Sequence, residues 1–245
     1  MKPRSWEIFI RSLFIQASLN QRKMQNLGFA FSILPAARGF AQDKGKMKSF
    51  LNRHLDRFNT HPYLAGAIIA SAVRLEGDLN NDQGEAVVSL KSVLAPPYAA
   101  IGDTFFWGAL RTFTALSAVI IAFNGSAWAP LAFVAVYNFF HCYIRYEGFK
   151  EGYRRGRQGY DYIGSLDLPR AGGYLRMLSL MLLGGLALPV TGMAAGRFLF
   201  SEDLFVRFGL LLLILVFYSL IKRGVSTLLI FYLMVAVTMV APIIL

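Results

Sequence analysis

The sequence predicts an all-α integral membrane protein, with N-terminal amphipathic and re-entrant helices followed by about five transmembrane helices. Its composition is 56% hydrophobic and only 16% charged, whereas a soluble domain carries about 25% charged residues. Charged residues are scarce mainly after the first hundred residues, where long apolar runs dominate. In lipid only a helix satisfies its backbone groups within one segment. We therefore divide the chain into an N-terminal helical region, 1–104, and a transmembrane region, 105–245.

Several charge-poor segments are long enough to approach the thickness of a bilayer, which takes about 20 apolar residues. We expect spans at 105–123, 128–144, 174–195, 204–221 and 225–245. Of the 25 Lys and Arg residues, 13 lie in 1–104 and seven in 145–176, while the link 124–126 has none. Since basic residues favour the cytoplasmic side, we expect a multi-pass protein of the bacterial inner membrane with its N-terminal region in the cytoplasm.

The N-terminal region mixes amphipathic and short apolar segments. Residues 5–40 predict one or two amphipathic helices, and 47–58 another. The apolar stretch 63–73, which follows Pro62, is too short to span and predicts a re-entrant or buried helix. We expect an exposed loop at 76–86 and a broken approach to the first span at 95–103, where Pro96 and Pro97 stand together.

The sequence excludes several function classes. A net charge of +11 comes from residues that flank apolar runs, and no nucleic-acid-binding motif is present. The single cysteine, Cys142, and three scattered histidines give no metal-binding spacing, so we expect no metal and no cofactor. No phosphate-binding loop or hydrolase motif occurs. We therefore expect no catalytic residue and no nucleic-acid partner.

Asp103 is the most informative polar residue, because it stands at the edge of the first expected span. An ionisable group there is costly unless it is paired or faces a polar cavity. Trp107 and Arg111 follow at helical spacing on the same face. Asp103 could equally cap the first turn of the span, and a capping carboxylate can still bind a hydroxyl with its second oxygen.

Two N-terminal polar groups are further candidates. Asn59 and His61 precede the short apolar stretch, and their side chains both donate and accept hydrogen bonds, although Asn-Thr-His-Pro is also ordinary turn chemistry. Gln16, Asn20 and Lys23 share one helical face, which is also typical of a solvated surface.

Two patterns concern the second expected span and the segment after it. Asn138, His141 and Arg145 form a polar stripe that we expect to face the bundle interior, where His141 would carry protons or, more simply, lock helix packing. Small residues repeat every four positions at Gly148, Gly152 and Gly156. That spacing allows close helix approach, and a basic cytoplasmic loop is the alternative interpretation.

In order along the chain, several segments resemble the IID membrane component of the mannose/fructose/sorbose phosphotransferase system. They are FIQASLNQRKMQNLGFAFSILPAAR (14–38), RHLDRFNTHPYLAGAIIASAVRLE (53–76), AIGDTFFWGALRT (100–112) and NGSAWAPLAFVAVYNFFHCYIRYEGFKEGY (124–153). The most specific strings are Q-x-S-x-N with M-Q-N-L-G-F, then F-N-T-x-P and I-G-D-x-x-F-W-G.

The resemblance implies a function that composition does not. Such a subunit pairs with a IIC subunit in the lipid bilayer to form the path for a hexose-type sugar, in a higher oligomer of IIC–IID pairs. Soluble IIA and IIB phosphocarrier proteins phosphorylate the sugar during uptake, and the IID chain itself carries no phosphoryl group. A non-transporting regulatory or scaffold subunit is the alternative. By matching position, the resemblance implies that the sugar pocket is lined by Gln16, Asn20, Asn59, His61 and Asp103, with Phe29 and Trp107 as aromatic walls.

Overall fold

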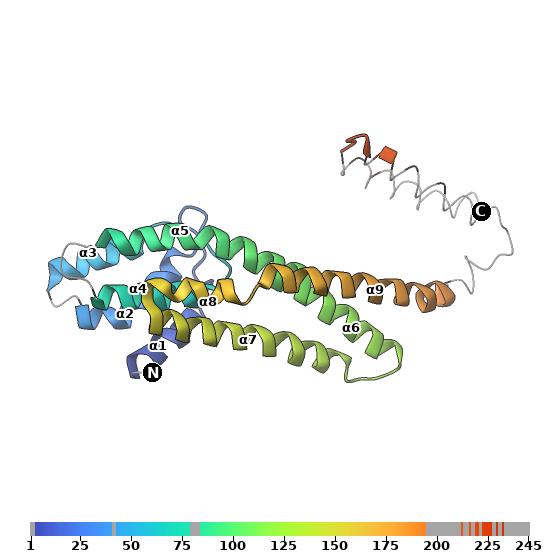
Figure 1. The fold of residues 1–245 in the computed structure, drawn as a ribbon, viewed down its shortest axis with the longest axis horizontal. Coiled ribbons are helices and arrows are strands. Elements are labelled where there is room, and N and C mark those ends of the chain that lie inside the picture. Colours follow the sequence, from blue (N-terminus) through green and yellow to red (C-terminus); the bar gives the residue numbers. More distant parts are fainter. Residues whose placement is uncertain are drawn as a thin grey trace. The chain divides into compact units, whose positions relative to one another are not determined.

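A computed structural model describes residues 3–40, 43–78 and 84–194, together with 212, 216, 219–220, 222–226, 229 and 232. The chain divides into two compact units, Met1–Leu183 and Gly184–Leu245. The helices α1 to α8 belong to the first unit, and α9 begins in it (Figure 1). The described part is built of helices, as the composition predicts. The α-helices are α1 Pro3–Ser12, α2 Asn26–Phe40, α3 Lys44–His54, α4 Ala65–Asp78, α5 Gly84–Gly102, α6 Arg111–Phe123, α7 Ala129–Arg155, α8 Tyr160–Ser165 and α9 Leu168–Ala194.

The longest helix runs without a break from Gly84 to Phe123, because α5 passes through a π-helical segment, Asp103–Leu110, into α6. The expected break at 95–103 is therefore wrong. Pro96 and Pro97 both lie on the exposed side of α5, so the carbonyl groups that lose their N–H partners are not buried. The irregularity lies instead in the π-helical segment, a rare geometry that is frequent at functional sites.

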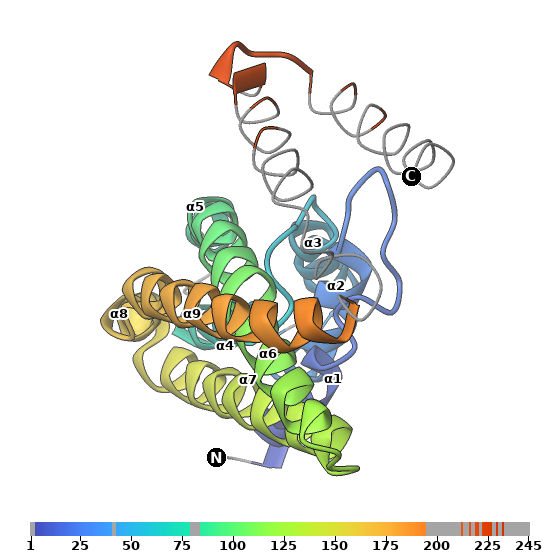
Figure 2. The ribbon, with the colours of Figure 1, turned by 90° about the vertical axis from the view of Figure 1, so that its right-hand side faces the viewer.

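The alanine-rich α4 lies at the centre of the bundle and packs against α7, α5, α2 and α1. Figure 2 shows α1, α2 and α3 on one side of this bundle and α8 on the other. Close approach to α7 depends on small residues, as the glycine spacing predicts. A side chain at Gly152 would overlap the carbonyl oxygen of Ala67, and Gly148 faces the Ala67 methyl group. Gly156 has a positive φ of 57° and ends α7.

The expected exposed loop at 76–86 is also only partly correct. Helix α4 continues to Asp78, and α5 already begins at Gly84. Glu76 is 6% exposed because its carboxylate binds Arg53 and His54 of α3. The polar residues of this stretch therefore have two environments, because Glu76 forms a buried ion pair while the residues at the end of α4 and the start of α5 flank a surface turn.

The expected polar stripe on α7 faces the interior only at one end. Arg145 is buried, His141 is half-buried and Asn138 is exposed. Burial therefore decreases along this face from Arg145 to Asn138, and the expectation that the whole stripe is internal is wrong.

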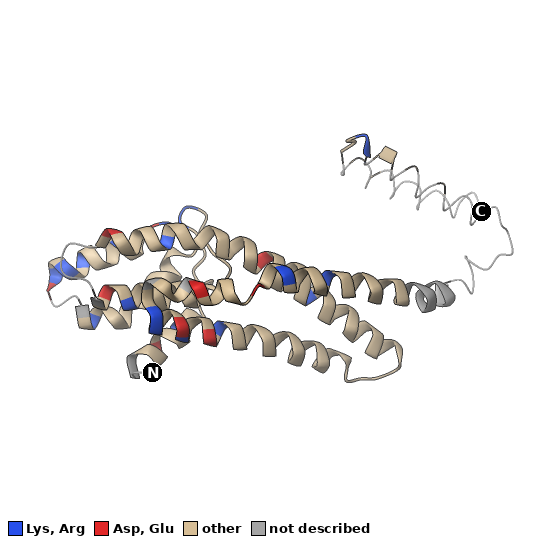
Figure 3. Ribbon diagram, viewed as in Figure 1, with Lys and Arg blue, Asp and Glu red and all other residues tan. Residues whose placement is uncertain are grey.

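One helix among the described residues, Gly84–Phe123, is long and apolar enough to cross a membrane. Its second half and α7 form a hairpin in which no charged residue stands between Arg111 and Arg145, as Figure 3 shows. Large apolar side chains are exposed along α7 and α9, among them Leu131, Phe139 and Leu180, which is typical of a surface that contacts lipid or another protein. The expected spans at 204–221 and 225–245 lie largely outside the described residues, so the count of five stays a prediction.

Candidate functional site

Two sequence motifs whose paired residues are 29 to 35 positions apart contact each other beside α2. The Gln25 backbone N–H donates to the Phe58 carbonyl at 2.8 Å, and the Phe58 N–H donates to the Lys23 carbonyl at 3.3 Å. Side chains of Lys23 and Asn26 donate to the Leu55 carbonyl at 3.1 and 2.9 Å. The segment that leads into α4 is therefore held by the segment that leads into α2.

Gln25 makes the tightest part of this pairing. Its side-chain amide donates to the Thr60 carbonyl at 2.8 Å, and its amide oxygen accepts from the Thr60 N–H at 3.0 Å. The Gln25 side chain is buried and so satisfies both backbone groups of the residue that precedes His61. It thereby sets the position of His61.

His61 lies in the turn before α4 and is only 1% exposed. Pro62 keeps the preceding backbone out of a helix, and α4 begins at Ala65. The imidazole stacks on Phe106 at 5.0 Å between ring centroids and lies against Trp107 at 4.8 Å. Both aromatic rings come from the π-helical segment, so the histidine joins α4 to the long helix.

The hydrogen bonding of His61 sets which of its nitrogens carries the proton. Its Nδ1 accepts from the Tyr63 backbone N–H at 3.3 Å. Burial, followed by the positive charges of Arg145 and His141, lowers the pKa of His61 to about 3. The ring is therefore neutral near pH 7, with its proton on Nε2. This Nε2–H is buried and has no hydrogen-bond partner among the residues that the structure describes.

Asp103 faces this unpaired donor from the first turn of the π-helical segment. Its Oδ1 lies 4.0 Å from His61 Nε2, and its side chain is 53% exposed. That distance is too long for a hydrogen bond. An oxygen atom that bridges the two groups from one side would accept from the imidazole and donate to the carboxylate, which is the pattern of a hydroxyl group or a water molecule. Because Nε2 is closed to solvent in this structure, such a bridge requires a small movement of Asp103 or of a neighbouring side chain.

Polar aromatic contacts continue from this site onto α7. The Tyr63 ring stacks on His141 at 4.2 Å, and the two tyrosine hydroxyls of Tyr63 and Tyr137 lie 3.4 Å apart. His141 Nε2 is in turn 2.6 Å from the Asn138 amide oxygen. The Asn138 amide nitrogen donates to the Val134 carbonyl at 2.7 Å, so this exposed side chain is hydrogen-bonded within α7.

Of the residues expected in the site, the structure brings together His61, Asp103 and Trp107. The others are placed differently. Phe29 is fully buried in the core, between His54 and Phe58, so it is not an open aromatic wall. Asn20 bonds within its own turn to Met24 and Asn26. The remaining two, Gln16 and Asn59, are exposed.

Sequence reasoning missed two residues on which the site depends. Gln25 stands inside the M-Q-N-L-G-F string, but the polar spacing that singles out Gln16 and Asn20 does not include it. Gly102 precedes Asp103 and lies directly against His61. The string I-G-D carried that signal, because a glycine beside a functional carboxylate indicates close approach of another group.

Comparison with known proteins gives a consistent match along the chain. The family model described as the PTS system mannose/fructose/sorbose family IID component matches residues 2–244. The fructose permease IID component of Bacillus subtilis (strain 168) is 32% identical over 160 residues, which are 64% of this chain and 58% of that protein. The mannose-specific EIID component of Escherichia coli (strain K12) is 37% identical over 154 residues, 61% of this chain and 54% of that protein.

The matched stretch thus spans little more than half the length of these curated relatives. Two solved structures are similar over almost the whole chain. One, titled "Structure of membrane protein", has a TM-score of 0.72 at 26% identity and covers 98% of this chain and 95% of its own. The other, a cryoEM structure of the mannose transporter ManYZ with microcin E492, has a TM-score of 0.60 at 26% identity and covers 98% and 94%.

Proposed function

Because this chain belongs to the mannose/fructose/sorbose phosphotransferase family as a IID component, we propose that it forms, with a IIC subunit, the path by which a hexose-type sugar enters the cell. In this proposal the pair resides in the bacterial inner membrane with the N-terminal region in the cytoplasm. Soluble IIA and IIB proteins phosphorylate the sugar during uptake. The name of one similar structure, a mannose transporter, supports the substrate class.

The observation that carries the proposal is the gap of 4.0 Å between His61 Nε2 and Asp103 Oδ1. A buried donor and an exposed carboxylate at this separation suit one sugar hydroxyl, which accepts from His61 and donates to Asp103. Trp107 lies against His61 and supplies a flat apolar surface for the C–H face of a sugar ring. Few precisely placed polar groups beside an aromatic wall are typical of ligand sites.

The exposure of this site supports a second membrane subunit. Asp103 is exposed at the start of a hairpin whose other exposed residues are largely apolar. A carboxylate that faces lipid is costly. A partner subunit that covers this side of the hairpin would supply the missing wall of the pocket and satisfy this carboxylate. A IIC subunit is the partner that we propose.

The proposal is tested by sugar uptake in cells that express this chain with the IIC, IIA and IIB proteins of the same gene cluster. Asp103→Asn is expected to lower uptake by about 10- to 100-fold, the loss of one charged hydrogen bond to the substrate. The matched control is Asp161→Asn, at an exposed carboxylate on α8, which is expected to leave uptake unchanged.

Co-purification of the chain with IIC shows whether the complex has assembled, and so separates an error in the site from an error in the proposed function. Unchanged uptake by Asp103→Asn in an assembled complex would remove Asp103 from the sugar path. An assembled wild-type complex that neither transports nor binds any hexose of a small panel would instead support the regulatory or scaffold function.

A further inference from the structure

Helix α3 carries unpaired positive charge that its own fold does not use. Lys44, Lys46 and Lys48 are exposed and form no ion pair within the described residues. Helix α3 itself contains no acidic residue, and the one carboxylate at its start, Asp43, caps the helix by accepting from the Lys46 backbone N–H. Cations in the first turns of a helix oppose its dipole, and Lys44 and Lys48 repel each other at i, i+4 spacing. These lysines therefore weaken the isolated helix slightly, which points to a role in contact with another molecule.

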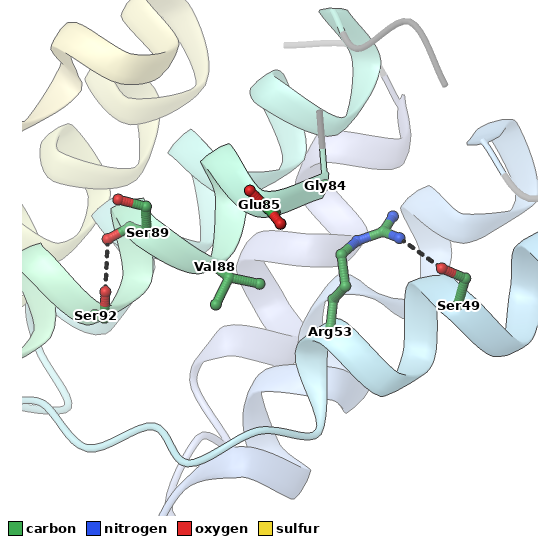
Figure 4. Close-up of a pocket in the computed structure, with 7 residues that line it drawn as sticks. All are labelled: Ser49, Arg53, Gly84, Glu85, Val88, Ser89 and Ser92. Atoms are coloured by element: carbon green, nitrogen blue, oxygen red, sulfur yellow. Dashed lines mark hydrogen bonds between the residues drawn. The ribbon is translucent and has the colours of Figure 1, made fainter. Parts of the chain in front are cut away.

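Two of these lysines border open clefts along one side of α3. Clefts of about 510 and 570 Å³ are lined by Lys48, and the second is also lined by Lys44. One aspartate lines each cleft, Asp56 the first and Asp43 the second, so lysine and arginine outnumber carboxylates in both. Asn52 lines both, one further turn along the same face. A third cleft, also of about 570 Å³, lies between α3 and α5, where Figure 4 shows Ser49 and Arg53 opposite Val88 and Ser89. We call the exposed face formed by Lys44, Lys48 and Asn52 the basic face.

The basic face is held rigidly by buried contacts on the other side of α3. Lys91 Nζ donates to the Arg53 carbonyl at 2.7 Å, and Arg53 binds both carboxylate oxygens of Glu76, at 3.1 and 2.8 Å. His54 Nε2 lies 3.0 Å from the same carboxylate. A surface fixed in this way loses little further conformational entropy when a partner binds.

The distance between the basic face and the start of the apolar hairpin argues against lipid headgroups as the ligand of this face. The α5 residues of the neighbouring cleft run from Gly84 to Ser92. Ser92 and Asp103, where the apolar hairpin begins, are eleven positions apart on one continuous helix, which is about 17 Å at ~1.5 Å per residue. Charges separated by more than about 8 Å are largely screened at physiological salt, so lipid headgroups at the start of the hairpin would attract the basic face only weakly.

We propose that the basic face, Lys44, Lys48 and Asn52, docks an acidic surface of a soluble protein partner. This inference rests on the proposed function, in which the soluble protein that must reach the complex is the phosphocarrier that phosphorylates the sugar. Positive charge on one partner and negative charge on the other speed encounter and fix orientation. Docking at α3 would bring the carrier to the polar end of the long helix, on the same helix as Asp103.

The chain offers a matched pair of variants for the test. Lys48→Glu changes the basic face, and Lys46→Glu changes a lysine on the opposite side of the same helix. Both place a glutamate near the N-terminal end of α3, where the helix dipole favours it, so both variants are expected to fold. The purified IIC–IID complex in nanodiscs of zwitterionic lipid is titrated with the IIB protein of the same gene cluster at about 50 and about 300 mM salt, a range over which screening of exposed charges increases.

Lys44→Glu/Lys48→Glu is expected to weaken IIB binding by about tenfold or more at low salt, and Lys48→Glu by a smaller factor, whereas Lys46→Glu changes it less than about twofold. Equal effects of Lys46→Glu and Lys48→Glu, or binding that requires anionic lipid, would overturn the proposal. If wild-type complex transports sugar while the double variant binds IIB normally, the docking face is wrong and the proposed function stands. If wild type neither binds IIB nor transports, the proposed function itself fails.

Discussion

His61 packs directly on the backbone of Gly102. A side chain at position 102 would overlap Cβ and Cγ of His61 and would lie 2.9 Å from its Nδ1. The histidine and the glycine belong to segments about 40 residues apart, and their contact is what brings the imidazole beside Asp103 and Trp107. A helix interior gains stability from alanine in place of glycine, by up to about 1 kcal/mol, so the glycine here reflects space and not helix propensity.

Gly102→Ala is therefore expected to displace His61 and to abolish most sugar uptake, while it costs about 1–3 kcal/mol of stability through overpacking. Thermal unfolding in detergent and uptake in cells measure the two effects. Gly173→Ala is the matched control, because nothing lies within 4 Å of a Cβ built at that helical glycine. A fully active Gly102→Ala protein would show that the position of His61 is not critical.

The two hydrogen bonds between the Gln25 side chain and the Thr60 backbone, which we call the clamp, predict that even a near-isosteric substitution of Gln25 lowers stability strongly. Gln25→Leu keeps the volume but leaves the Thr60 N–H and carbonyl without partners in a buried site. Each unsatisfied group costs about 1–3 kcal/mol, so we expect a loss of about 2–5 kcal/mol together with lower uptake. Gln16→Leu, at an exposed amide in the neighbouring turn, is expected to change stability by less than about 0.5 kcal/mol. Similar unfolding temperatures for the two variants would contradict the clamp.

The buried His54–Glu76 pair predicts that acid destabilises the protein. Burial lowers the pKa of His54 from 6.5 despite its hydrogen bond to Glu76. Burial alone would raise the pKa of Glu76, but hydrogen bonds from His54 and Arg53 bring it below 4.5. Below pH 6.5 the unfolded chain binds a proton on His54 that the folded chain excludes, so stability falls as the pH falls. Glu76 acts in the same direction at lower pH.

The measurement is the unfolding temperature between about pH 8 and about pH 5. One such histidine contributes at most about 1.4 kcal/mol per pH unit. His54→Gln, which can still donate to Glu76, is expected to flatten the dependence below pH 6.5 while it retains most of the stability at pH 8. His61, whose pKa burial lowers to about 3, adds the residual slope. An unchanged slope in His54→Gln would show that His54 is protonated in the folded protein.

The composition and the apolar runs were enough to predict a helical membrane protein, and the order of short motifs was enough to indicate its family. These properties are local, because they depend on segment length, on the spacing of apolar residues and on residues that stand next to each other in the chain. The expected turn at Pro62 and the small-residue contact at Gly152 are confirmed for the same reason. The expected break at Pro96 was wrong, because Pro96 and Pro97 lie on the exposed side of α5, where the carbonyl groups that lose their N–H partners are not buried.

Only the tertiary structure decided which polar residues meet. Phe29 and Asp103 stand in equally specific strings, yet one lies in the core and the other is exposed beside His61. Gln25 finds its partner 35 residues away in Thr60, and residue spacing within one helix carries no information about such a contact. The placement of His61 against Gly102, and its separation of 4.0 Å from Asp103, follow from the packing of α4 on the long helix, because close packing fixes side chains that periodicity leaves free to face either way.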